Sequence, residues 1–219
     1  MAKPRFSEID DTNREDHSRL LPDDKCYYLY EYTSSQNWSF GDTNQLISNL
    51  KKKPSLKGTA QYRYKAQAIA RCISEIRTAL NPTWLAGATL VPTPGSKAAG
   101  HPDHDDRLEQ ICRGLGKDID VRNLVVQAAS TEAAHEVQAG SRVTVEQLLE
   151  IYMIEEALAG PAPQYIGVLD DMLTAGTHFR AMKTILGDRF PNVPVIGFFV
   201  ARRVFPKAEI DASDLNEWF

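Results

Sequence analysis

The chain has 219 residues, of which 42% are hydrophobic and 25% charged, and this predicts one medium-sized globular domain with a sizeable core. A net charge of −4 argues against a surface that coats nucleic acid, while leaving room for a local basic patch. No apolar run approaches a membrane span, and the polar N-terminus is unlike a signal peptide. Cysteines 26, 72 and 112 are scattered without a CxxC pair, which favours reduced thiols in a cytoplasmic protein.

The first fifty residues divide into a polar segment, a strand and a helix. Residues 1–25 are dense in charge and are expected to form a solvated arm or a short surface helix. Residues 26–33 are aromatic and β-prone, so we expect a strand. Asp42 or Thr43 can cap a helix that ends at the run Lys51-Lys52-Lys53-Pro54. Three lysines at this place are typical of a solvated helix end, and the alternative is a patch for phosphate or nucleic acid.

The longest helix is expected over residues 59–80. Apolar residues recur there at helical spacing, Ala66, Ile69, Ala70, Ile73, Ile76 and Leu80, before Asn81-Pro82 ends the helix. A short strand, residues 88–92, then leads into the loop TPGSKAAGHPDHDDR. Its prolines and glycines exclude a helix or strand interior, so the loop projects from a strand end with several backbone amides available. The alternative is an ordinary surface loop.

A helix over residues 105–115 follows this loop, and Arg107 lies on its first turn. His101 and His104, with Asp103, Asp105 and Asp106 nearby, raise zinc as an alternative. Asp103 or His104 can instead begin the helix.

The second half continues the alternation of strands and helices. Strands are expected over residues 123–127 and 193–201, and a helix over 144–158. Phe198 and Phe199 are expected in the core, or one of them could stack on a base. Arg202 and Arg203 follow the last strand. The acidic tail, 207–219, ends in Trp218-Phe219 and is expected to dock on the body or on a second subunit.

The most informative stretch for function is residues 165–186, YIGVLDDMLTAGTHFRAMKTIL. Residues 165–169 predict a buried strand, Asp170 and Asp171 mark its end, and Thr174-Ala175-Gly176-Thr177 forms a small-residue turn before a helix. Ligands of open α/β sheets bind at the carboxyl ends of strands, and free amides at a helix start attract phosphate. The two carboxylates can accept hydrogen bonds from ribose hydroxyls or hold Mg²⁺ through water. The alternative is a simple βα turn with an acidic strand end.

A hydrophobic strand followed by DDMLTAGT resembles the phosphoribosyl-pyrophosphate (PRPP) motif of type I phosphoribosyltransferases. The resemblance implies that Asp170 and Asp171 take the ribose, and that Thr174, Ala175, Gly176 and Thr177 cradle the 5-phosphate. The family usually has Thr or Ser where this chain has His178, and a His at this position could still bond the phosphate of PRPP. The VP-x-P stretch followed by a basic residue, and the strand ending in Ala-Arg, are also similar to the ComF-like branch, whose Gly-Phe-Asn-Gln stretch is missing here.

The same resemblance implies roles for two loops. Thr93, Pro94, Gly95, Ser96 and Lys97 would hold the pyrophosphate of PRPP, with Lys97 and Arg107 meeting the diphosphate and Mg²⁺ as cofactor. Residues 130–142 would form a mobile loop over the reaction centre, from which His135 and Arg142 could reach the ligand.

These observations together predict an α/β fold with a mostly parallel central sheet of about five strands flanked by helices, and with a small hood or flexible loop. The phosphoribosyltransferase-like domain would span 26–206.

The expected function is transfer of phosphoribosyl from PRPP to a nitrogenous acceptor such as a nucleobase, as in nucleotide metabolism, with release of pyrophosphate. The residues expected to be catalytic are Asp170, Asp171, Lys97 and Arg107. One alternative is a non-catalytic PRPP- or nucleotide-binding accessory module in DNA uptake, stress or defence, acting as a homodimer or with an accessory protein. Another is a nucleic-acid-contacting protein that uses Lys51 to Lys53 and Arg202-Arg203.

Overall fold

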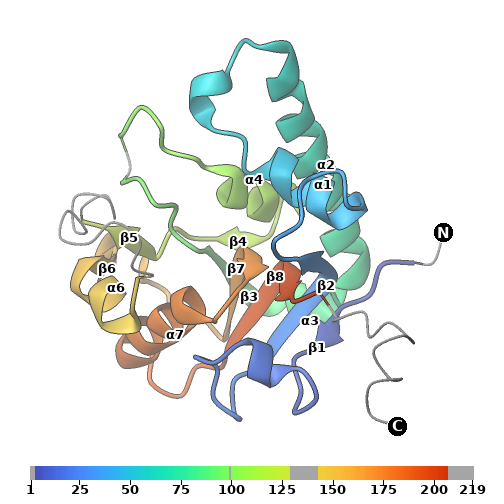
Figure 1. Cartoon of the computed structure of the whole chain (residues 1–219). Helices are drawn as coiled ribbons and strands as arrows, with labels where there is room; N and C mark the ends of the chain where they lie inside the picture. The colour runs from blue at the N-terminus through green and yellow to red at the C-terminus, as the bar shows by residue number, and fades with distance from the viewer. Residues whose placement is uncertain (1–2, 99, 129–142, 207–219) are drawn as a thin grey trace, which may run out of the picture.

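The computed structural model describes residues 3–98, 100–128 and 143–206. Their main feature is a six-stranded sheet in the order β1-β2-β8-β7-β3-β4 (Figure 1). Its strands are β1 (Ser7–Glu8), β2 (Cys26–Thr33), β8 (Val195–Val204), β7 (Tyr165–Leu173), β3 (Ala88–Pro92) and β4 (Asp120–Val121). All neighbouring strands are parallel except β1, which pairs antiparallel with β2. The expected α/β class and mostly parallel sheet are confirmed, with the difference that the sheet is mixed at one edge.

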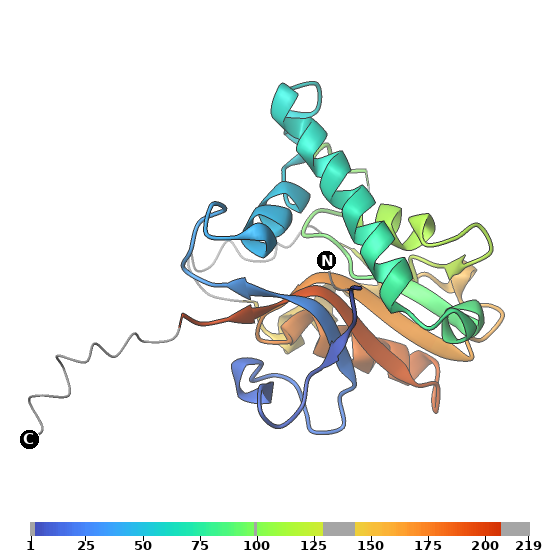
Figure 2. The ribbon, with the colours of Figure 1, turned by 90° about the vertical axis from the view of Figure 1, so that its right-hand side faces the viewer.

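Helices cover both faces of this sheet. One face packs against α1 (Asp42–Leu50), α2 (Arg63–Ala79) and α4 (Arg107–Gly114), and the other against α6 (Val145–Ile151) and α7 (Thr177–Arg189). Neighbouring strand residues alternate between the two cores: Val168 and Phe199 join one, while Leu169 and Phe198 join the other. Figure 2 shows the long helix α2 slanting across its face of the sheet. Phe198 and Phe199 are therefore core residues, as expected.

The sheet's carboxyl edge carries the acidic motif, and the strand there is longer than expected. β7 continues to Leu173 because it pairs with β8 as far as Leu173 opposite Arg202. Asp170 and Asp171 consequently lie inside a strand and not at its end. The last strand is extended in the same way, so that Arg202 and Arg203 belong to β8.

A separate antiparallel ribbon is formed by β5 (Val125–Gln127) and β6 (Tyr152–Ile154). The expected helix over 144–158 was wrong in its second half. Its start is correct, because Thr144 and Gln147 form a reciprocal capping box, but α6 ends at Ile151. The backbone of the next residues pairs with β5, Gln127 lying opposite Tyr152, and this pairing replaces further helical hydrogen bonds.

The N-terminal segment also differs from the expected solvated arm. Most of its acidic residues are exposed, but Ile9, His17 and Leu20 are buried, and β1 joins the sheet. Asp24, also buried, pairs with Arg180 at 2.9 Å and Lys183 at 2.7 Å on α7. A few apolar residues and one buried carboxylate thus fasten a polar segment to the body.

Short helical segments fill the remaining connections: η1 (Arg14–Asp16), η2 (Pro54–Leu56), η3 (Ala60–Tyr62), α3 (Pro82–Gly87) and η4 (Glu156–Leu158). Within the described ranges, no helix combines the length and apolar character needed to cross a membrane. The expected loop 130–142, with His135 and Arg142, and the tail 207–219, with Trp218-Phe219, lie outside the described residues.

Candidate functional site

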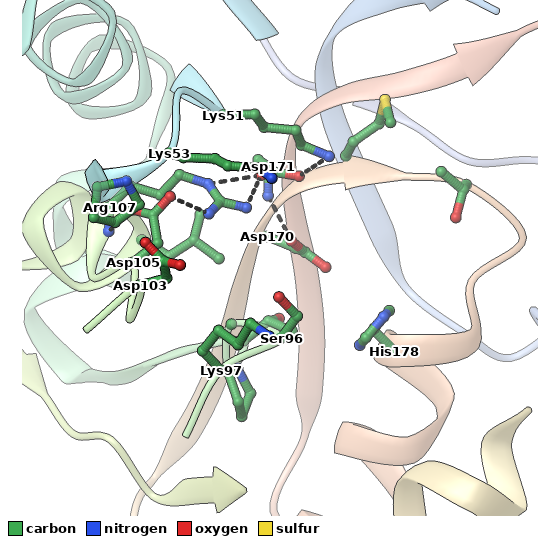
Figure 3. A pocket seen from close by; sticks show the side chains of 17 residues that line it. Lys51, Lys53, Ser96, Lys97, Asp103, Asp105, Arg107, Asp170, Asp171 and His178 are labelled. Carbon is green, nitrogen blue, oxygen red and sulfur yellow. Dashed lines mark hydrogen bonds and ion pairs between the residues drawn. The ribbon is translucent and has the colours of Figure 1, made fainter. Parts of the chain in front are cut away.

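A cavity of about 600 Å³ opens at the carboxyl ends of β3 and β7 (Figure 3). Four segments that are distant in sequence supply its walls: the end of α1, the loop after β3, the start of α4, and β7 with the first turn of α7. They contribute Lys51, Lys53, Pro54, Thr93, Pro94, Gly95, Ser96, Lys97, Asp103, Asp105, Arg107, Leu108, Asp170, Asp171, Met172, Thr174 and His178. The two loops singled out in the sequence therefore meet at one cavity.

The strand register explains this meeting. Pro92, the last residue of β3, lies opposite Leu169 of β7, and the Thr93 amide donates to the Leu169 carbonyl at 2.9 Å. Thr93 is buried, whereas Gly95, Ser96 and Lys97 continue along the cavity wall, with all of the loop's described peptide bonds in the trans form. Parallel pairing of two strands thus places the loop beside Asp170.

The two adjacent aspartates have different surroundings. Successive strand residues point to opposite sides, and Figure 3 shows Asp170 turned toward the space between Ser96 and His178. The Asp171 side chain is only 4% exposed. It accepts from Arg107 Nε at 2.9 Å and lies 3.0 Å from Lys51 Nζ. Asp170 therefore faces the cavity, whereas Asp171, expected to hold ribose as well, is already engaged by two cations.

These surroundings shift the pKa values of Asp170 and Asp171 in opposite directions. Burial and the neighbouring Asp171 carboxylate raise the pKa of Asp170 to about 7. Burial also opposes ionisation of Asp171, but Lys51 and Arg107 outweigh it and lower the pKa of that carboxyl. Near neutral pH, Asp171 is a carboxylate, whereas Asp170 exchanges a proton with solvent or ligand.

Arg107 belongs to a chain of mostly buried charges in the wall of the cavity. Its guanidinium binds Asp171 on one side and Asp105 at 2.8 Å on the other. Asp105 in turn accepts from Lys65 Nζ at 2.6 Å, and Lys65 also donates to the carbonyls of Leu50 and Lys52. This chain fixes the ends of α1, α2 and α4 relative to β7. Arg107, expected to meet a diphosphate, lines the cavity but is committed to two carboxylates.

Two residues of this chain were missed by the sequence interpretation. Lys51 was assigned to a solvated helix end, and Lys65 was passed over. Lys65 had a usable signal, because it shares one helical face with Ile69, Cys72 and Ile76, where an isolated charge is unusual. Lys51 had no comparable signal, since its partner, Asp171 on β7, lies 120 residues further along the sequence.

The turn before α7 has the geometry of a helix start. Gly176 has φ +89, and the first intrahelical bond runs from the Arg180 amide to the Gly176 carbonyl at 2.9 Å. The amides of Thr177 and His178 precede that bond, as in any helix first turn. Thr174 and His178 line the cavity, whereas Ala175, Gly176 and Thr177, expected to cradle phosphate as well, are not among its lining residues.

The N-terminal segment packs against the back of this turn. The His17 ring bonds the Thr174 carbonyl, and the Arg19 amide donates to the Ala175 carbonyl at 2.8 Å. A side chain placed on Gly176 would come within 2.8 Å of Leu20. The segment expected to be a free arm thus supports the turn.

Replacing Gly176 with alanine is expected to lower the free energy of unfolding by about 1–3 kcal/mol, because alanine is strained at this left-handed φ and also meets Leu20. Urea unfolding measures the change. Gly187→Ala is the matched control: that glycine lies within α7 with nothing within 4 Å of the added carbon, so alanine should be neutral or stabilise by up to about 1 kcal/mol. Equal effects at both positions would contradict this account.

The histidines and acids of the loop after β3 were considered as metal ligands. Among the described residues, no group of three or more His, Cys, Asp or Glu is placed to hold a metal ion. His101 accepts from the Asp103 amide at 3.0 Å, and the His104 ring bonds the Lys97 carbonyl at 3.0 Å, so each histidine has a backbone partner. Mg²⁺ bound beside Asp170 would take most of its ligands from water and from phosphate oxygens, which is how this ion is commonly held.

The second basic pair considered for nucleic acid lies away from this cavity. Arg202 pairs with Asp16 at 3.0 Å and with Glu31, and its side chain is 11% exposed. Its charge is therefore balanced within the protein.

Comparison with known proteins does not assign this chain to a family. No protein-family model matches the chain, and no curated protein matches it significantly. Inference of function consequently rests on the residues of the cavity.

Proposed function

We propose that this chain is a phosphoribosyltransferase-like protein that binds PRPP with Mg²⁺ and transfers its phosphoribosyl group to a nitrogenous acceptor, releasing pyrophosphate. The observation that supports this most is the convergence of three features on one cavity: the loop 93–97, the Asp170 carboxyl and the first turn of α7. Polyol, phosphate and diphosphate groups are what a carboxylate, a helix start and a lysine-bearing loop recognise.

Each wall of the cavity suits one part of such a ligand. Asp170 would accept hydrogen bonds from ribose hydroxyls and would stabilise positive charge as it develops at the anomeric carbon. Thr174, His178 and the amides that begin α7 would bind the 5-phosphate. Lys53 and Lys97 would meet the diphosphate, where Mg²⁺ would supply further charge neutralisation of the leaving group. Arg107 would position Asp171 and the α4 start without contacting the ligand.

A titration of the full chain with PRPP and Mg²⁺ tests this proposal. We expect saturable binding, release of pyrophosphate when purine or pyrimidine bases are added, and a loss of at least tenfold in PRPP affinity for Asp170→Asn, because an amide accepts hydrogen bonds from hydroxyls less strongly than a carboxylate. Asp188→Asn, an exposed residue of α7, is the control and should bind as the unmodified chain does. Absence of PRPP binding by the unmodified chain would refute the proposal.

A non-catalytic PRPP- or nucleotide-binding module is the second candidate. Lys51, Lys53, Lys97 and Arg107 line the cavity, but Lys51 and Arg107 are paired with Asp171. This pairing leaves less positive charge for a leaving diphosphate, and it favours binding over chemistry. Tight PRPP binding without pyrophosphate release across a panel of bases would identify this function.

A further inference from the structure

His178 differs from the other residues of the turn because its ring is held by a second buried side chain. The Tyr152 hydroxyl lies 2.8 Å from His178 Nδ1. Tyr152 begins β6 and is 3% exposed, while His178 is the second residue of α7 and lines the cavity. Figure 3 shows the imidazole directed toward the same open space as Ser96 and Asp170. The ring is therefore fixed at one nitrogen and presented to the cavity at the other.

The Tyr152 hydroxyl keeps its hydrogen in these surroundings. Burial raises the pKa of Tyr152 far above neutral, so the side chain stays a phenol. The Tyr152 hydroxyl can therefore donate its hydrogen to an unprotonated His178 Nδ1.

His178 is a neutral ring in these surroundings. Burial lowers the pKa of the imidazole, and Lys51 acts in the same direction, while the Asp171 carboxylate opposes them without reversing the shift. A neutral imidazole that accepts at Nδ1 carries its hydrogen on Nε2. With Tyr152 as the donor, the neutral ring is a single tautomer that presents its N–H to the cavity.

We propose that His178 is a fixed, neutral hydrogen-bond donor of the ligand site, and that Tyr152 positions it so that Nε2–H meets an oxygen of the ligand's 5-phosphate. The ligand part of this inference rests on the proposed function. A threonine hydroxyl at this place could rotate, donate or accept, whereas the held imidazole only donates. A donor of this kind binds the charged oxygen of a phosphate dianion more strongly than the neutral oxygen of a sugar hydroxyl.

Nitrogen-15 NMR of the full chain without ligand tests the positioning of the ring. We expect His178 at pH 7 to show a protonated Nε2 and an unprotonated Nδ1, and expect Tyr152→Phe to give a mixture of the two neutral tautomers. Tyr165→Phe is the matched control, since Gln164 contacts that hydroxyl at the amino end of β7, and it should leave His178 unchanged. A protonated Nδ1 in the unmodified chain, or no change in Tyr152→Phe, would overturn the assignment.

Binding of ribose 5-phosphate tests the contact itself, because this probe carries the 5-phosphate without the diphosphate. Tyr152→Phe and His178→Asn should each weaken binding about tenfold, the size typical of one lost hydrogen bond to a charged group. His178→Gln can place an amide N–H near the position of Nε2, and we expect it to recover most of the affinity. If the unmodified chain binds the probe and these variants bind it equally well, this inference fails alone; if neither PRPP nor the probe binds, the proposed function fails with it.

Discussion

Arg107→Ala is expected to lower the free energy of unfolding by about 3–5 kcal/mol, the cost of removing one partner from a buried ion pair. The guanidinium serves two carboxylates, with Asp171 and Asp105 both largely buried around it. Without it, Lys51 is the cationic partner left to Asp171 and Lys65 the one left to Asp105, among the residues that the structure describes. Two poorly solvated carboxylates then remain, each with one of its two cationic partners. Unfolding of the variant should therefore occur at a markedly lower urea concentration.

Arg113→Ala provides the control within the same helix. Arg113 also pairs with an acid, Glu109 at 2.8 Å, but its side chain is 57% exposed against 16% for Arg107. An exposed pair of this kind contributes about 0.5 kcal/mol or less. The contrast between the two variants isolates burial as the cause. Similar losses from both would show that Arg107 is solvated in solution and that the charge chain in the wall of the cavity is weak.

Periodicity and turn chemistry predicted most elements of the fold. The strand over 88–92 and the helix that begins after Gly176 appear where the sequence indicates them. The family resemblance also implied that the two distant loops meet at one ligand, and both of them line the cavity. The alanines of α2 did not indicate its buried face: Ala66 and Ala70, which were counted among the apolar residues at helical spacing, are exposed, whereas Lys65 and Ala68 are buried.

Interactions between distant side chains were not accessible to the same reasoning. Two aspartates in DDMLTAGT look equivalent in the sequence, yet a strand sends their carboxyls to opposite sides, and Lys51 and Arg107 meet only one of them. The Tyr152–His178 contact likewise depends on a ribbon that interrupts an apparently helical stretch. The local sequence pattern identifies candidate site residues, whereas tertiary packing determines which of them are already paired with other side chains.

The difference between the two aspartates leads to opposite expectations for their amide variants. The folded-state pKa of Asp170 is about 7, above its ordinary value of 3.8. Between these values the folded chain holds a proton that the unfolded chain has lost, so this group lowers the free energy of unfolding as pH rises through that window. Above pH 7 the full cost of a buried carboxylate remains.

Asp170→Asn removes this cost, and we expect it to raise the free energy of unfolding by about 2 kcal/mol at pH 8, with the gain vanishing near pH 4. The amide oxygen can still accept the Asp171 N–H that Asp170 now accepts at 2.7 Å. Asp171→Asn should do the reverse at pH 8, because Lys51 and Arg107 lose the carboxylate whose pKa they lower. Urea unfolding of both variants across this pH range measures the two signs. A gain in stability for Asp170→Asn alone, together with its expected loss of PRPP affinity, would mean that the chain keeps a destabilising carboxylate at this position for ligand binding. A loss of stability in Asp170→Asn at pH 8 would show instead that Asp170 is a structural group like Asp171.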